Sequence, residues 1–98
     1  MCRNITELRG LEPPATDEEI SAAALQFVRK VSGVTRPTLQ NAHHMEQAVQ
    51  QIADIVRGLL ETLPERRQPP KSLPPLRRPE VRRRLGLEAF DASTPTNA

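Results

Sequence analysis

Aromatic residues are scarce in this chain, which has no tryptophan, no tyrosine and only two phenylalanines among 98 residues. Proteins that bind single-stranded nucleic acid without sequence preference stack the bases on aromatic side chains. Phe27 lies in an apolar helical pattern that predicts burial, and Phe90 lies outside the basic segment of the chain. Base stacking is therefore not the expected way for this protein to bind a nucleic acid.

Cysteine is equally scarce, because Cys2 is the single cysteine of the chain. One cysteine excludes an intramolecular disulfide framework. No apolar run is long enough to span a bilayer, and no basic and then apolar leader opens the sequence. We therefore expect a cytoplasmic protein with no membrane partner.

Familiar catalytic motifs are absent as well: the sequence has no CxxC pair, HExxH motif, glycine-rich phosphate loop or serine elbow. No cofactor is predicted on this basis. Catalytic groups can also converge from distant positions, so an enzymatic role stays open. The absence of these motifs nevertheless favours a protein that is not an enzyme.

The stretch from Thr16 to Gly33 carries both the start and the stop signals of an amphipathic helix. Thr16 is a good N-cap, and Glu19 completes a capping box with it. Gly33 suits the left-handed residue that follows many helices. A helix over about 16–32 is therefore predicted, with its apolar stripe in the core: Ile20, Ala23, Ala24, Phe27, Val28 and Val31.

A second helix is predicted over about 40–63, with Thr38 or Asn41 as its cap and Pro64 as its end. Its apolar residues recur at helical spacing from Met45 to Leu63. The short connector between the two helices favours an antiparallel hairpin. The predicted fold is therefore an all-α helical hairpin, with an N-terminal segment packed on it through Ile5, Leu8 and Leu11.

The composition changes at Pro64, which predicts a helical domain over 1–63 and a basic, proline-rich tail over 64–98. Residues 64–84 carry eight Lys or Arg against two Glu, and six of the ten prolines lie there. Such a segment is expected to be largely extended or disordered. Pro79 and Gly86 bracket a possible short third helix at about 79–85.

Three stretches of the first 33 residues resemble a known family: residues 1–5 (Met-Cys-Arg-Asn-Ile), residues 12–20 around the Pro13-Pro14 pair, and residues 22–33. They are similar to the small bacterial proteins of domain-of-unknown-function family 2277. The resemblance covers about residues 1–63. It implies no activity, cofactor or catalytic residue.

Cys2 is the candidate for thiol or metal chemistry. Removal of Met1 leaves an N-terminal cysteine whose amine lies beside its thiol, and this pair can act as nucleophile and base or chelate a metal. The simpler interpretation is a small apolar side chain packed on the helices.

His43 and His44 are the other candidate metal ligands. Neighbours on a helix point about 100° apart, so this pair needs Cys2 and a carboxylate to complete a site. Two solvated histidines in a first helical turn are the simpler interpretation, and no metal is predicted.

The basic segment suggests nucleic-acid binding through phosphate contacts as an alternative function. A solubilising tail or linker is the simpler interpretation of the same charges. The residues that would make the phosphate contacts are Arg66, Arg67, Lys71, Arg77, Arg78, Arg82, Arg83 and Arg84.

The leading interpretation is a non-enzymatic protein that binds a protein partner or a second copy of itself. The apolar stripe of the second helix is long enough to extend beyond the first helix. Its far end, Leu59, Leu60 and Leu63, then needs another cover, so this is the predicted interaction surface.

Overall fold

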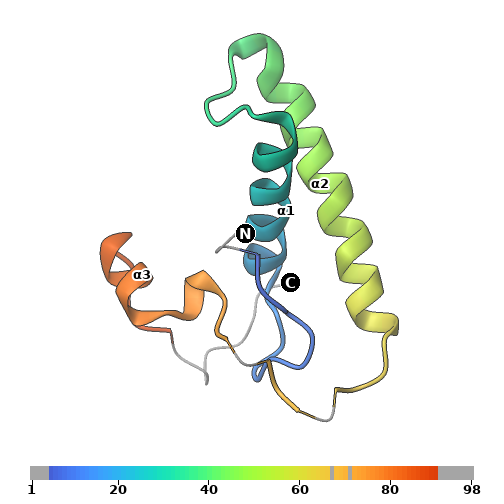
Figure 1. Cartoon of the computed structure of the whole chain (residues 1–98), viewed down its shortest axis with the longest axis vertical. Coiled ribbons are helices and arrows are strands. Elements are labelled where there is room, and N and C mark those ends of the chain that lie inside the picture. Colours follow the sequence, from blue (N-terminus) through green and yellow to red (C-terminus); the bar gives the residue numbers. More distant parts are fainter. Residues whose placement is uncertain (1–4, 67, 71, 91–98) are drawn as a thin grey trace.

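The computed structural model describes residues 5–66, 68–70 and 72–90. Two long helices, α1 (Asp17–Ser32) and α2 (Leu39–Thr62), pack side by side as a hairpin (Figure 1). A 3-10 helix, η1 (Pro75–Arg77), and a short helix, α3 (Pro79–Arg84), follow them. The predicted all-α hairpin is confirmed, including the short third helix, and η1 is an element that the sequence pattern did not predict.

The predicted start and end of α1 are both present. The Thr16 hydroxyl accepts a hydrogen bond from the Glu19 N–H at 3.1 Å, and the Thr16 N–H donates to the Glu19 carboxylate at 2.9 Å. Gly33 adopts the left-handed conformation, with φ 72°, and its N–H bonds the Arg29 carbonyl. These local bonds satisfy backbone groups that every helix leaves unpaired at its ends.

The start of α2 was ambiguous in the sequence, and the structure shows that Thr38 is the cap. Its hydroxyl accepts from the Asn41 N–H at 3.3 Å. The helix ends at Thr62, and the cap residue Leu63, directly before Pro64, has an extended backbone. Pro disfavours helical backbone in the residue that precedes it, which explains this end.

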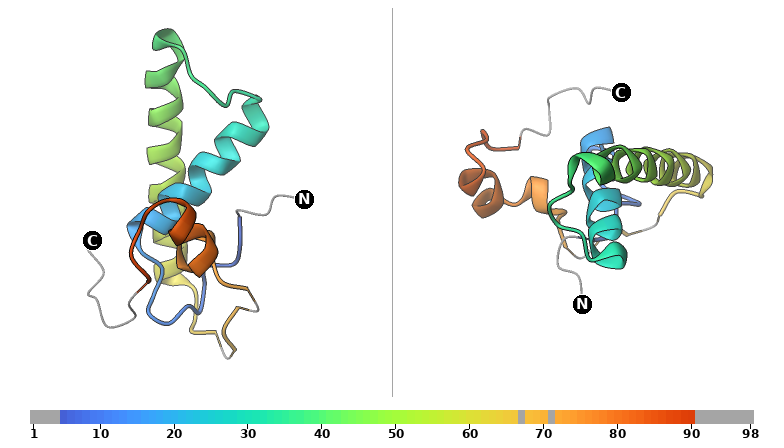
Figure 2. Two further views of the ribbon diagram at one scale, coloured as in Figure 1. Left: turned by 90° about the vertical axis from the view of Figure 1, so that its left-hand side faces the viewer. Right: turned by 90° about the horizontal axis from the view of Figure 1, so that it is seen from above.

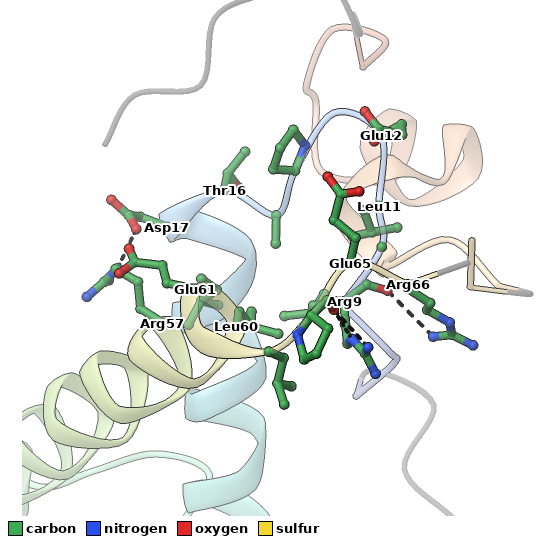
Figure 3. Close-up of a pocket in the computed structure, with 17 residues that line it drawn as sticks. Arg9, Leu11, Glu12, Thr16, Asp17, Arg57, Leu60, Glu61, Glu65 and Arg66 are labelled. Atoms are coloured by element: carbon green, nitrogen blue, oxygen red, sulfur yellow. Dashed lines mark hydrogen bonds and ion pairs between the residues drawn. The ribbon is translucent and has the colours of Figure 1, made fainter. Parts of the chain in front are cut away.

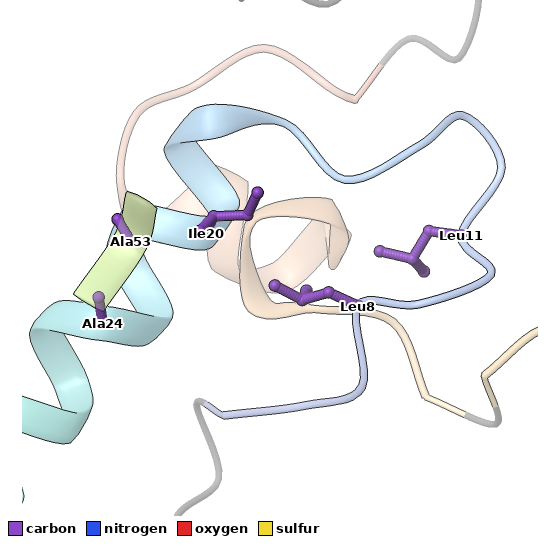
Figure 4. Packing of buried hydrophobic residues seen from close by; sticks show 5 residues of the cluster. All are labelled: Leu8, Leu11, Ile20, Ala24 and Ala53. Carbon is purple, nitrogen blue, oxygen red and sulfur yellow. The ribbon is translucent and has the colours of Figure 1, made fainter. Parts of the chain in front are cut away.

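The core is small and joins the N-terminal segment to both helices (Figure 4). Its helical members include two alanines, Ala24 from α1 and Ala53 from α2, whose small side chains allow the helices to approach closely. The predicted packing of the N-terminal segment holds for Leu8 and Leu11. It was wrong for Ile5, which is 40 % exposed.

Two side chains in the far half of the α1 stripe are exposed, which corrects the prediction that Phe27 and Val31 belong to the core. These side chains are 46 % and 68 % exposed. Figure 2 shows that α1 and α2 diverge toward the connector of residues 33–38, so the last turns of α1 have less of α2 against them.

The segment after Pro64 returns to the start of α1. Arg77 is buried there, and its guanidinium donates to the backbone carbonyls of Pro13 at 2.7 Å and Pro14 at 3.1 Å. The Phe90 ring covers the guanidinium carbon at 4.5 Å, a cation–π distance. The division into a domain over 1–63 and a tail over 64–98 stays a prediction, and a fragment can test it.

Candidate functional site

The residues predicted for thiol or metal chemistry do not come together in the described structure. Cys2 lies outside the described residues. His43 and His44 are both exposed on the first turns of α2, with ring centroids 6.0 Å apart and planes tilted by 57°. Within the described ranges, no group of three or more His, Cys, Asp or Glu side chains is placed to hold a metal ion.

Much of the predicted nucleic-acid surface is engaged in contacts within the chain. Arg66 pairs with Glu7, and Arg77 is buried. Arg78 donates to the Leu73 carbonyl at 2.9 Å, and Arg82 donates to the Leu76 carbonyl at 2.7 Å. Of the others, Arg83 and Arg84 are exposed, whereas Arg67 and Lys71 lie outside the described residues.

A hollow of about 620 Å³ lies where the N-terminal loop, the start of α1 and the end of α2 meet (Figure 3). Three arginines line it, and each donates to an acceptor of the protein. Arg9 donates to the Pro64 carbonyl through Nε at 3.1 Å and Nη2 at 2.8 Å, while Arg66 pairs with Glu7. These cations therefore join the walls of the hollow to one another.

The third of these arginines, Arg57, links the two helices. Its Nε lies 2.7 Å from Asp17, and its Nη1 lies 2.7 Å from Asp54.

These two hydrogen bonds raise the pKa of Arg57 above its ordinary value, and the bond to Asp17 has the larger effect. A raised pKa for a cation means that its contribution to stability is lost only as the pH rises through the folded-state pKa, far above neutrality. Solvent screens this half-exposed pair, so its stabilising effect is small.

The predicted interaction surface on α2 is partly present. Leu59 is 52 % exposed and Leu63 is 39 % exposed, whereas Leu60 is partly buried against the core cluster. That these residues form an interaction surface stays a prediction. The structure adds Ile55, which is 72 % exposed. Ile55 lies four residues before Leu59, and Leu63 lies four residues after it. The i, i+4, i+8 spacing is the signal that identifies all three, which we call the α2 stripe.

Three helical positions beside the α2 stripe are uncharged. Gln51, Gly58 and Thr62 occupy the adjacent helical positions, at −4, +3 and +7 from Ile55. The Thr62 hydroxyl donates to the Gly58 carbonyl at 2.7 Å, so its hydrogen-bonding capacity is used within the helix. A Cβ added at Gly58 would meet nothing within 4 Å, so this position leaves room for another chain.

Every helix of the described chain is too short or too polar to cross a membrane. The cytoplasmic location expected from the sequence stays a prediction.

Comparison with known proteins identifies a family and no individual relative. No curated protein and no solved structure matches the chain. One family model matches residues 1–84, which includes η1, Arg77 and α3 and extends beyond the resemblance seen over about residues 1–63. The chain therefore belongs to the family described as uncharacterized conserved protein (DUF2277).

Proposed function

We propose that this protein acts through protein–protein interaction, and that the partner held by the α2 stripe is a second copy of the chain. The exposure of three large apolar side chains at i, i+4 and i+8 supports the proposal. Apolar surface on one helix face gains free energy when another apolar surface covers it.

Self-association is favoured over a different partner by the charge pattern around the stripe. In a two-fold symmetric dimer the same patch faces itself, so a charge close to the two-fold axis meets its own copy. Gln51, Gly58 and Thr62 carry none. Two antiparallel copies of α2 can therefore pack with Leu59 near the two-fold axis and without like-charge repulsion at these three positions.

The expected affinity follows from the size of the stripe. Fully burying one Leu or Ile side chain contributes about 1.5–3 kcal/mol, and a symmetric dimer buries six of them. Association itself costs about 4–15 kcal/mol. These terms have similar size, so we expect a reversible dimer rather than a permanent one.

Sedimentation velocity over a wide concentration range tests this proposal. The wild-type chain is expected to shift from monomer to dimer, whereas Leu59→Ser stays monomeric with unchanged helical circular dichroism. Val31→Ser is the matched control, because Val31 is exposed on α1 and lies outside the stripe. A wild-type chain that stays monomeric throughout, or a control that dissociates as Leu59→Ser does, contradicts the proposal.

A further inference from the structure

A second hollow, of about 370 Å³, lies between α1, residues 6–8 and the segment 74–85. Its volume falls within the range of small-molecule sites, which is about 300–1,000 Å³. Most of its walls are apolar, and the side chains come from α1 on one side and from the returning segment on the other: Ala22, Ala23, Leu25, Leu76, Val81 and Leu85. The interior therefore suits an apolar ligand body.

Two cations on different elements line the same hollow. Arg29 belongs to the last turn of α1, and Arg84 ends α3. Both are exposed, and neither forms an ion pair or donates a side-chain hydrogen bond to any described residue. This distinguishes them from the arginines of the larger hollow, which are engaged in joining its walls.

The one carboxylate that lines this hollow is Glu19, and it is already bonded to Arg77 at 2.7 Å. The charge available to a ligand is therefore positive. Thr6 also borders the hollow, and its buried hydroxyl oxygen has no hydrogen-bond partner among the described residues.

We infer that this hollow binds a medium-chain fatty carboxylate, with the acyl chain among the apolar side chains and the carboxylate between Arg29 and Arg84. A guanidinium can bind a carboxylate through two parallel hydrogen bonds, which makes arginine well suited to this headgroup. The site goes beyond self-association and uses none of the residues of the α2 stripe.

Isothermal titration of the full-length chain with decanoate, below its micelle-forming concentration, tests the site. Decanoate is expected to bind, and octanoate about tenfold more weakly, because each buried methylene adds to the affinity. Decanol, which lacks the charge, is expected to bind at least tenfold more weakly than decanoate.

The chain offers a matched control for each arginine. Arg29→Gln and Arg84→Gln are each expected to weaken decanoate binding about tenfold, since each removes a charge-assisted hydrogen bond. Lys30→Gln and Arg83→Gln remove the same charge from the adjacent positions, which do not line the hollow, and should leave the affinity unchanged. Ala22→Leu, at an exposed position of the wall, should abolish binding by filling the hollow.

Three results overturn the inference. The first is no binding of decanoate to the folded wild-type chain. The second is equal weakening by the arginine variants and their neighbouring controls, which indicates attraction by overall charge alone. The third is binding of inorganic phosphate or decanol that is as tight as binding of decanoate. Tight phosphate binding would show that the apolar chain is not needed, and tight decanol binding would show that the charged headgroup is not needed.

Discussion

The carboxylate of Glu19 accepts two hydrogen bonds from Arg77, one from Nε to Oε2 at 2.7 Å and one from Nη2 to Oε1 at 3.0 Å. Their side chains are only 2 % and 3 % exposed, respectively. The same carboxylate also caps the first turn of α1 through Thr16. One buried ion pair therefore couples the start of the first helix to a segment 58 residues later in the chain.

Replacement of Arg77 by methionine is expected to reduce the free energy of unfolding by about 3–5 kcal/mol, because the Glu19 charge is left buried without its partner. Chemical denaturation followed by circular dichroism measures this loss. Arg78→Met is the matched control, since Arg78 is less buried and its side chain bonds one backbone carbonyl. It should cost about 1 kcal/mol.

The double variant Arg77→Met with Glu19→Gln distinguishes the effect of an unpaired buried charge on stability from the effect of lost packing. Removing both charges is expected to recover part of the loss, because no unpaired charge remains buried. Equal losses for Arg77→Met and Arg78→Met would contradict the structural role of this pair.

A fragment of residues 1–63 tests the predicted division of the chain. It lacks Arg77, so Glu19 loses its buried partner, and it also lacks the Pro64 carbonyl that Arg9 bonds. We expect this fragment to unfold at lower denaturant concentration than the whole chain. A fragment of residues 1–90 is the control, since it keeps Arg77 and Phe90. If residues 1–63 alone unfold at the midpoint of the whole chain, the segment after Pro64 does not contribute to stability.

Gly10→Ala is expected to destabilise the protein more than Gly86→Ala. Both glycines have positive φ, 87° and 74°, where a Cβ costs about 1–2 kcal/mol. At Gly10 the added Cβ would also lie 3.0 Å from the Cβ and the Cδ of Arg66, whereas nothing lies within 4 Å at Gly86. Thermal unfolding of the two variants compares them directly. Equal decreases in the unfolding temperature of the two variants would show that the Arg66 side chain moves aside without a loss of stability.

Both ends of α1 and the end of α2 could be predicted from the sequence alone. Thr16, Glu19 and Gly33 act on backbone groups within a few residues of themselves, so their roles do not depend on the rest of the fold. Pro64 ends α2 for the same reason, because its ring restricts only its neighbours. Helical periodicity also places Leu59 and Leu63 on one face with Ile55, the face that the structure leaves exposed.

The tertiary structure decided which parts of those stripes are buried and which cations are available. Phe27 fits the apolar pattern of α1 as well as Val28 does, but Phe27 is exposed and Val28 is buried, because consecutive side chains on a helix point about 100° apart. Arg77 has no local feature that separates it from Arg78, yet it alone reaches Glu19. Contacts between residues far apart in the chain depend on the path of the backbone between them, and periodicity and charge counts contain no information about that path.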